Sequence, residues 1–417
     1  MQRVAIVEGC RTPFVRAGGK FAEASFLDLG VHTLKSLVER MALDPRSIDE
    51  FVFGTVLLDP RAPNYAREVV LRSGLPETIS AHAVSNNCIS GLVALSMLTD
   101  GIRCERIKVG IGGGSESMSR PTLTLHPKAE RLFLALSRAR TVGERLKLVA
   151  RYRPKFALPI PPSPKEPSTG LTMGQHCEIT TQELGIKREV QDQIAFRSHQ
   201  RAAAAQKSGY LAAEIAPYAG VEHDNLVRAD TSLEKLAKLA PVFDRSGKGT
   251  LTAGNSSALT DGASLVCLMS ESEARRQGRD ILGFIEGIHF AAIAPRDGLL
   301  MAPTVALPEL LARHNLTVDQ IDRFEIHEAF GAQVAANLEV WERGWSKYAG
   351  ARVIGAIPEE KINVNGGSIA IGHPFAATGG RLVLSLAREL KRTNLNTGVI
   401  SVCAAGAMAG AVLIRRA

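Results

Sequence analysis

The chain has 417 residues, which corresponds to two or three domains at roughly 150 residues each. Its 45% apolar and 22% charged residues are typical of a globular protein and exclude disorder or a collagen-like structure for the chain as a whole. The formal net charge is +8, and the excess lies within residues 120–165 while the rest is nearly neutral. A nucleic-acid-binding protein would spread its basic charge over the fold, so we predict no nucleic-acid partner.

No run of about 18 apolar residues occurs, so no membrane-spanning helix is expected. The first eight residues are typical of a strand, and we expect neither a signal peptide nor a transit peptide there. The six cysteines are scattered along the chain: Cys10, Cys88, Cys104, Cys177, Cys267 and Cys403. No pair has CxxC spacing, which predicts free thiols in a reducing cytoplasm and no zinc or other metal site.

Short β-rich runs alternate with helical stretches along the chain, which is typical of α/β layers. We predict strands at 4–7, 50–56, 107–111, 264–269, 323–326 and 398–402. We predict helices at 26–40, 89–100, 304–314 and 379–391. The two halves of the chain also correspond in three pairs of segments: 47–51 with 320–324, 86–91 with 366–373, and 112–115 with 403–407. This repeat predicts one α/β unit that is duplicated, with its site at the strand ends.

Residues 120–165 stand between the two halves and carry eleven Lys or Arg against two acidic residues. Small or apolar residues recur there at spacings of three and four, which predicts helix: Leu132, Leu136, Ala139, Gly143, Leu146 and Ala150. The proline-rich stretch 159–167 should end the helical structure. Three interpretations remain open, namely a solvated hairpin, a surface that contacts an anionic membrane or a partner protein, and a field that attracts an anionic cofactor.

Two cysteines and two histidines lie at predicted strand ends or in small-residue loops: Cys88, Cys403, His327 and His373. Backbone N–H groups and the helix dipole should stabilise a Cys88 thiolate, because a loop enters a helix there. His327 does not begin an HExxH zinc motif, since position 331 is Gly331. Each residue alone could be structural, but together they indicate acyl transfer through a cysteine with a histidine base and a backbone oxyanion hole.

Several motifs in the chain follow the order of the thiolase family over essentially its whole length. They are 7–14 (VEGCRTPF), 87–88 (NC), 112–119 (GGGSESMS), 252–257 (TAGNSS), 261–263 (DGA), 327–330 (HEAF), 372–374 (GHP) and 403–406 (CAAG). The sequence therefore resembles thiolases. The histidine of HEAF, the CAAG motif and the basic insertion are most similar to the thiolase (β) subunit of the trifunctional fatty-acid β-oxidation complex.

The resemblance implies the thiolase fold, with two duplicated α/β core domains in a layered αβαβα arrangement and an inserted loop domain. The N-terminal core would span 1–120 and be completed by about 250–275. The loop domain would span 121–250 and include the basic insertion, and the C-terminal core would span 276–417.

The resemblance also implies a 3-ketoacyl-CoA thiolase, an acetyl-CoA C-acyltransferase of β-oxidation that works by ping-pong covalent catalysis. Cys88 would carry the acyl thioester, and His373 would take the Cys88 proton and help to bind the thioester oxygen. Cys403 would exchange a proton with the acetyl carbon or with CoA. His327 would position a water molecule in the oxyanion hole or donate there itself.

The backbone N–H groups of Cys88 and Ala405 would form a second oxyanion hole, and Ser257, Met173 and Arg228 would contact CoA. By the same resemblance, CoA and acyl-CoA are substrates and no cofactor is bound permanently. The implied partners are a second copy in a homodimeric core and an α-subunit with hydratase and dehydrogenase activity. Peripheral contact with the inner face of the membrane through residues 120–165 is a further expectation.

Two departures from the family pattern leave the acyl-chain preference open. Ala405 and Ala407 stand where Gly is common, and a glutamine-glycine pair near Met408 is missing.

Three alternatives remain, the first a biosynthetic acetyl-CoA C-acetyltransferase that makes acetoacetyl-CoA. The second, a ketoacyl synthase, would need a histidine at position 403, and the third is a non-catalytic scaffold with the thiolase fold.

Overall fold

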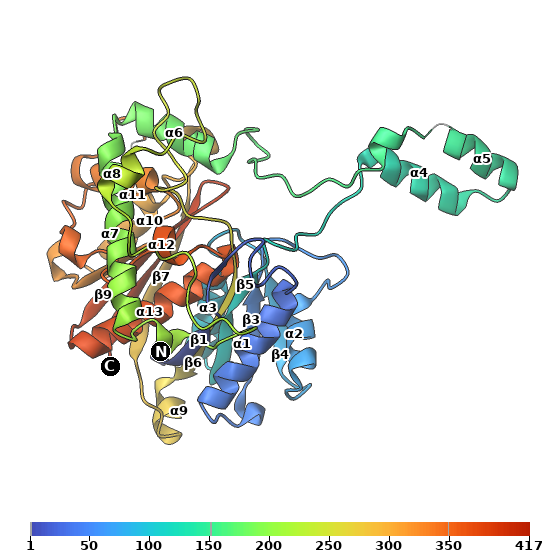
Figure 1. The fold of residues 1–417 in the computed structure, drawn as a ribbon. Coiled ribbons are helices and arrows are strands. Elements are labelled where there is room, and N and C mark those ends of the chain that lie inside the picture. The colour runs from blue at the N-terminus through green and yellow to red at the C-terminus, as the bar shows by residue number, and fades with distance from the viewer. Residues whose placement is uncertain (1, 151, 349) are drawn as a thin grey trace.

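A computed structural model describes residues 2–150, 152–348 and 350–417. Within these residues the strands form one ten-stranded sheet (Figure 1). Its order is β4 (Ser80–Val84), β3 (Glu50–Gly54), β5 (Val109–Glu116), β6 (Thr260–Ser270), β1 (Val4–Arg11), β7 (Gly283–Ala292), β10 (Met408–Arg416), β9 (Thr397–Ala404) and β8 (Arg323–Ile326). The short strand β2 (Val15–Arg16) pairs with β6. All six predicted strands are present, whereas β2, β4, β7 and β10 were not predicted.

The predicted duplication is confirmed by the strand pairing. At the centre of the sheet β1 and β7 pair antiparallel. From there outwards, β1–β6–β5–β3 and β7–β10–β9–β8 both show two antiparallel pairings followed by a parallel one. Strand β4 adds one more parallel pairing to the N-terminal half and leaves that half with an exposed edge.

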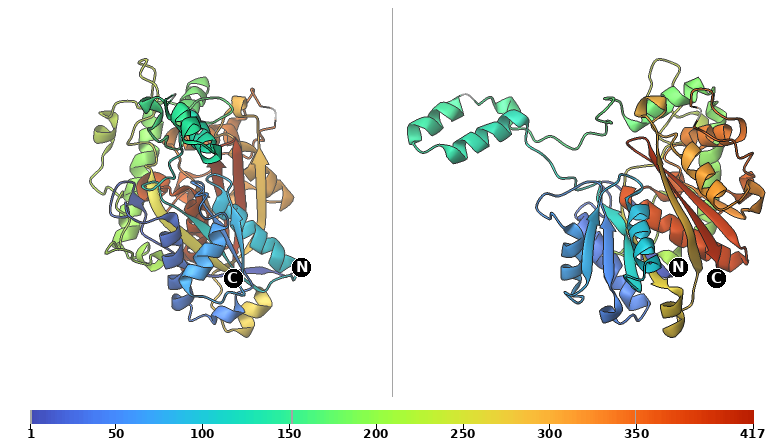
Figure 2. Two further views of the ribbon diagram at one scale, coloured as in Figure 1. Left: turned by 90° about the vertical axis from the view of Figure 1, so that its right-hand side faces the viewer. Right: turned by 180° about the vertical axis from the view of Figure 1, so that it is seen from behind.

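Helices lie in three layers with the two halves of the sheet between them, as the predicted αβαβα order requires (Figure 2). Helices α1 (Phe26–Arg40) and α2 (Tyr65–Ser73) pack on the outer face of the N-terminal half. The middle layer consists of α3 (Ser90–Arg103) and α13 (Thr378–Thr393). On the far side, α10 (Pro303–Arg313) and α11 (Gly331–Arg343) cover the C-terminal half.

The predicted bounds of the 26–40 helix agree with α1 because its capping signal is local. Ser25 Oγ accepts a hydrogen bond from the Asp28 N–H, and the Asp28 carboxylate accepts the Ser25 N–H in return. Such a capping box satisfies two N–H groups that the first turn leaves unpaired, so loss of the Ser25 hydroxyl should cost about 1 kcal/mol.

The remaining helices occur in the connections between strands. They are α4 (Pro127–Arg138), α5 (Val142–Ala150), α6 (Met173–Glu183), α7 (Arg188–Lys207), α8 (Leu233–Ala237), α9 (Glu271–Arg276) and α12 (Ser368–Ile371). Helices α6 and α7 pack against α11, and α12 packs against α7. Through these contacts, the segment between β5 and β6 packs on the side of the C-terminal half of the sheet.

Residues 120–165, here called the arm, project from the rest of the molecule as two helices, α4 and α5 (Figures 1 and 2). The predicted helical structure is present, but it is divided, because Ala139 adopts an extended conformation at the end of α4. Paired backbone hydrogen bonds between Thr124 and Ile160 close the base of the arm. Among the described residues, no helix is both long and apolar enough to cross a bilayer.

Candidate active site

Four segments from both halves of the chain meet where the middle helices approach the sheet. Cys88 lies two residues before α3, and His327 follows β8 directly. His373 lies between α12 and α13, and Cys403 lies near the end of β9. The close packing of these segments depends on Gly91 in the first turn of α3, because a Cβ atom there would lie 2.5 Å from the Ala376 carbonyl oxygen.

The thiol of Cys88 and the ring of His373 form a direct pair. Nε2 of His373 lies 3.2 Å from Cys88 Sγ, and Nδ1 lies 2.6 Å from Thr378 Oγ1. Burial, followed by the charge of Arg381, lowers the pKa of His373 to about 3. The ring is therefore neutral near pH 7 and can accept the Cys88 proton at Nε2.

Burial raises the pKa of the Cys88 thiol to about 12, although the backbone N–H groups of Ala405 and of Cys88 itself act in the opposite direction. The backbone N–H groups thus act in the direction that the sequence predicted, but burial outweighs them and the resting sulfur is protonated. These two N–H groups belong to different halves of the chain. Donors in this arrangement can stabilise negative charge that develops next to the sulfur when it attacks a carbonyl.

His327 lies beside His373, with the two ring centroids 4.1 Å apart. Its Nδ1 is 2.8 Å from Ser368 Oγ, while its buried Nε2 has no hydrogen-bond partner in the part of the chain that the structure describes. Burial, together with His373 and Arg381, holds the pKa of His327 well below its ordinary value. His327 is therefore a neutral ring with one free nitrogen at the site.

Cys403 is a second buried thiol, 2% exposed, in an apolar cluster with Phe330 and Leu251. Burial raises its pKa well above the ordinary value, and the proximity of Cys88 and Cys177 raises it further. The structure thus brings both predicted cysteines and both predicted histidines into one region.

The loop after Cys403 is fixed from two directions. Asn87 Nδ2 donates to the Ala405 carbonyl oxygen at 3.0 Å, and the Gly406 N–H donates to Glu166 Oε2 at 3.0 Å. Ala407 has a φ of 57°, a left-handed conformation that costs a non-glycine residue about 1 kcal/mol. Glycine adopts this conformation without that cost, which explains why glycine is favourable at position 407.

Of the three predicted CoA contacts, two lie against elements of the site. The N–H and hydroxyl of Ser257 both donate to the Ala329 carbonyl oxygen, at 3.0 and 3.1 Å. Met173 packs against the apolar cluster that contains Cys403. The side chain of Arg228 is exposed, and the backbone N–H of Arg228 donates to His199 Nδ1.

Four polar residues that support the site were not predicted: Glu166, Ser368, Thr378 and Arg381. Ser368 and Thr378 lie in the small-residue stretch around His373, so their spacing from that histidine was a usable signal. Glu166 contacts a loop 240 residues later in the chain, and Arg381 reaches His327 only through Ser368, so the local sequence of neither carries a comparable signal.

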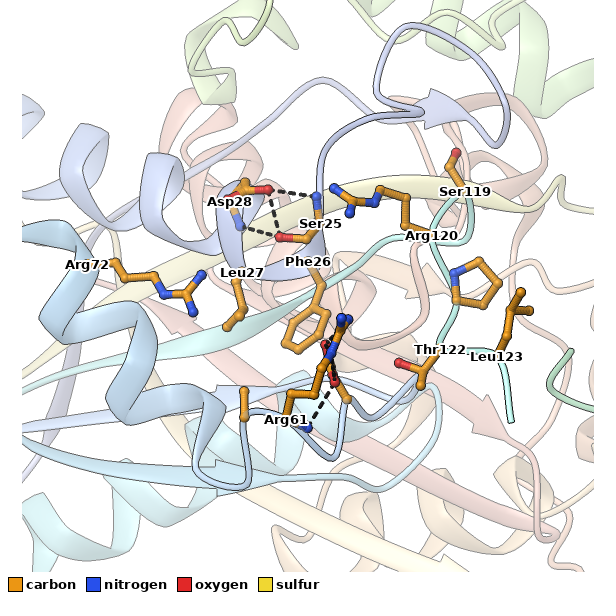
Figure 3. Close-up of a pocket in the computed structure, with 13 residues that line it drawn as sticks. Ser25, Phe26, Leu27, Asp28, Arg61, Arg72, Ser119, Arg120, Thr122 and Leu123 are labelled. Carbon is orange, nitrogen blue, oxygen red and sulfur yellow. Dashed lines mark hydrogen bonds and ion pairs between the residues drawn. The ribbon is translucent and has the colours of Figure 1, made fainter. Parts of the chain in front are cut away.

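A separate cavity of about 750 Å³ lies between α1, α2 and the start of the arm (Figure 3). Its lining includes Arg61, Arg72 and Arg120, but neither of the site's cysteines nor either of its histidines. Arg61 is paired with Asp59, and Arg120 donates to the Glu23 carbonyl oxygen. This cavity is therefore distinct from the cysteine–histidine site.

Comparison with known proteins identifies the family. The model of the thiolase N-terminal domain matches residues 4–272, and that of the thiolase C-terminal domain matches residues 280–416. The chain is 40% identical to the 3-ketoacyl-CoA thiolase of Pseudoalteromonas translucida, covering 100% of this chain and 97% of that protein. It is also 40% identical to the 3-ketoacyl-CoA thiolase of Shewanella sediminis, with 99% and 96% covered.

Among solved structures, the acetyl-CoA acetyltransferase of Bacillus anthracis superposes with a TM-score of 0.84 at 29% identity, covering 100% of this chain and 99% of that one. The predicted fold class is thereby confirmed, since that enzyme and this chain share their architecture over their whole lengths. The chain belongs to the thiolase family of acyltransferases.

Proposed function

We propose that this chain is a 3-ketoacyl-CoA thiolase, which uses CoA to cleave 3-ketoacyl-CoA into acetyl-CoA and a shortened acyl-CoA. The observation that carries the proposal is the Cys88–His373 pair, with 3.2 Å between Sγ and Nε2, together with the backbone N–H groups of Cys88 and Ala405, which act to lower the pKa of this thiol. The substrate class is that named for the relatives at 40% identity.

In the first half-reaction, His373 Nε2 takes the Cys88 proton while the sulfur attacks the 3-keto carbon. The N–H groups of Cys88 and Ala405 hold the resulting oxyanion. The bond between the carbonyl carbon and the α-carbon then breaks, which leaves an acyl thioester on Cys88 and the enolate of acetyl-CoA. His327 and His373 stabilise the enolate oxygen, and Cys403 protonates the carbon.

In the second half-reaction, the Cys403 thiolate takes the proton of an incoming CoA thiol. The CoA sulfur attacks the acyl thioester, and the same two N–H groups hold the oxyanion. Cys88 leaves as a thiolate and recovers its proton from His373. Two thiols are needed because the one that carries the acyl group cannot also protonate the acetyl carbon in the same step.

For CoA, Ser257 and Met173 are the contacts that lie beside the site, and Arg228 would meet the nucleotide portion on the surface. CoA and acyl-CoA enter as substrates, and none of these steps requires a permanently bound cofactor. The division into two core domains with a loop domain at 121–250 places these contacts on the loop domain and on the segment that follows it.

Acylation of Cys88 tests the function directly. Enzyme quenched after mixing with 3-ketoacyl-CoA, without free CoA, should carry an acyl group on the peptide that contains Cys88. Cys88→Ala should show neither adduct nor turnover, and Cys104→Ala, at an exposed free cysteine, should retain both. An unmodified Cys88 peptide together with rapid turnover would exclude this mechanism.

The competing activity is biosynthetic condensation to acetoacetyl-CoA, which the structural match to the acetyl-CoA acetyltransferase of Bacillus anthracis favours. The two activities share their catalytic residues but differ in chain length. Efficient turnover of 3-ketohexadecanoyl-CoA supports the degradative enzyme. Activity restricted to acetoacetyl-CoA would support the biosynthetic one.

A homodimeric core is supported by strand β4. It ends the sheet, most of its residues are exposed, and its outer edge is available for pairing with the same strand of a second copy. Light scattering should give the mass of a dimer or of a multiple of it. A proline at Ala83 should shift the protein toward monomer, because it removes a strand N–H.

The arm supports two further proposals, peripheral contact with an anionic membrane and docking of an α-subunit with hydratase and dehydrogenase activity. Its charge and exposed apolar side chains, including Phe133 and Leu146, suit the membrane best. The protein would then be cytoplasmic and able to reach the inner face of the membrane. Co-purification of a hydratase from native cells would instead favour the α-subunit.

A further inference from the structure

A short chain of buried hydrogen bonds runs from Arg381 through Ser368 to His327. Arg381 Nη2 donates to Ser368 Oγ at 3.0 Å, and Ser368 Oγ lies 2.8 Å from His327 Nδ1. All three residues are essentially inaccessible to solvent. Arg381 also lies 3.7 Å from the Glu325 carboxylate, which provides a counter-charge.

The direction of these hydrogen bonds determines where the histidine proton resides. An arginine guanidinium can only donate, so Ser368 Oγ is the acceptor of the bond from Arg381. The hydroxyl proton of Ser368 then has His327 Nδ1 as its one acceptor among the contacts of the described residues. Nδ1 must therefore carry the lone pair, and the ring proton must be on Nε2.

The opposite tautomer leaves one more buried group without a partner. If Nδ1 carried the proton and donated to Ser368, the serine hydroxyl proton would have no acceptor among the described residues. Nε2 has no partner in the described residues in either tautomer, so the serine hydroxyl decides between them. Unpaired buried polar groups are unfavourable, so the arrangement selects the Nε2–H tautomer.

We propose that Ser368 and Arg381 are positioning residues that hold His327 as the Nε2–H tautomer, so that the ring itself donates to the substrate thioester oxygen. The inference rests on the proposed thiolase function and deepens it, because it decides between a direct donor and a water held by His327. Neither Ser368 nor Arg381 reaches the reacting atoms. They act on the reaction only through the histidine ring.

The neighbouring ring shows why this proton must be fixed. His373 accepts the Cys88 proton at Nε2 and so becomes charged during the reaction. Its centroid is only 4.1 Å from that of His327, so a second positive ring there would be strongly opposed. His327 therefore has to act as a neutral donor, and a neutral imidazole has a single N–H to place.

Nitrogen-15 NMR of the histidine-labelled full-length protein reads the tautomer directly. The wild type should show a pyrrole-type signal for His327 Nε2 and a pyridine-type signal for Nδ1, assigned by their loss in His327→Asn. Ser368→Ala should give a mixture of tautomers, and Ser368→Thr should restore the wild-type pattern. A pyrrole-type Nδ1 in the wild type would overturn the proposal.

Steady-state kinetics supply the second measurement. Loss of one oxyanion donor typically lowers kcat about 100-fold or more, so a donor that is retained but mispositioned in Ser368→Ala should lower kcat about tenfold with little change in KM. Ser368→Thr should recover most of kcat. Ser385→Ala is the matched control, because it removes a buried hydroxyl on the same helix as Arg381 that has no hydrogen-bond partner among the residues described. An unchanged kcat in Ser368→Ala would refute the role of Ser368.

Alkylation of Cys88 by iodoacetamide separates this inference from the underlying function. The alkylation requires only the Cys88–His373 pair and should proceed at the wild-type rate in Ser368→Ala. If Cys88 were not acylated by substrate in the wild type, the thiolase mechanism would fail. If Cys88 were acylated normally while Ser368→Ala kept both its tautomer and its kcat, only the positioning proposal would fail.

Discussion

The side-chain amide of Asn87 donates a 3.0 Å hydrogen bond to the carbonyl oxygen of Ala405, which lies 318 residues later in the chain. This bond joins the loop of the nucleophile to the loop that follows Cys403. The two N–H groups proposed to hold the oxyanion, those of Cys88 and Ala405, therefore belong to different halves of a duplicated fold. The proposed oxyanion hole would therefore form only when both halves have docked.

Substitutions of Asn87 should test whether this bond aligns the two N–H groups. Asn87 has a φ of 51°, which glycine also adopts readily, so Asn87→Gly keeps the backbone conformation and removes only the bond. A hydrogen bond contributes about 1 kcal/mol net, so kcat should fall about fivefold. Asn87→Asp places a carboxylate against the Ala405 carbonyl oxygen and should lower kcat further. Equal kcat in the wild type and both variants would contradict the proposed alignment.

Cys403→Ser should separate the acid–base role of Cys403 from that of the nucleophile. The hydroxyl is a much poorer acid and base than the thiol, so turnover should fall by about 100-fold or more, as for loss of a general acid–base group. Iodoacetamide should still alkylate Cys88 in this variant, because the Cys88–His373 pair is intact. Near-native turnover in Cys403→Ser would show that another group transfers the proton.

The parts of the molecule that the sequence could predict are those with local signals. Helix α1 has the bounds that were predicted, and its start is set by a local feature, the capping box that Ser25 and Asp28 form within four residues. Cys88 and His373 were found because each lies in a small-residue loop next to a helix. Such signals need no knowledge of which segments meet.

The parts that were missed depend on contacts between distant segments. Helix α7 was not predicted because polar residues make up half of its buried positions, and Asp192 there is satisfied by Arg188 and Asn255 rather than by apolar packing. Its pattern therefore lacks the apolar periodicity of an amphipathic helix. Glu166 became relevant only when the base of the arm packed beside Gly406.

His199 should contribute a measurable dependence of stability on pH. Burial, followed by the charge of Arg228, lowers its pKa to about 4 from 6.5. As the pH falls, a histidine whose pKa is depressed in the folded protein is protonated first in the unfolded chain. The free energy of unfolding is therefore highest above pH 6.5 and falls as the pH drops toward 4. At pH 5 the loss should be about 2 kcal/mol relative to pH 7.

His199→Asn provides the comparison, because the amide oxygen can accept the Arg228 N–H that now reaches His199 Nδ1. Urea unfolding at pH 7 and pH 5 should show the wild type losing more stability than the variant. The comparison between the two proteins removes the contribution of other titrating groups. Parallel pH profiles would mean that folding does not lower the pKa of His199.

The arm should bind anionic vesicles through its basic side chains. Each basic residue close to such a surface contributes about 1 kcal/mol, so four substitutions to Gln in the arm should weaken binding at least tenfold. The substituted residues are Arg131, Arg138, Arg145 and Lys147. Vesicle sedimentation with phosphatidylglycerol measures the effect, while neutral phosphatidylcholine vesicles should bind weakly in every case.

The matched control removes the same charge from exposed sites elsewhere: Lys35, Lys187, Lys207 and Arg296. Because the arm projects from the core, its variant should retain full thiolase activity and an unchanged unfolding transition. If both charge variants lost vesicle binding equally, binding would depend on the net charge of the protein rather than on the arm. If neither lost binding, the membrane proposal would be wrong, and the exposed apolar residues of α4 and α5 would remain as a surface for a protein partner.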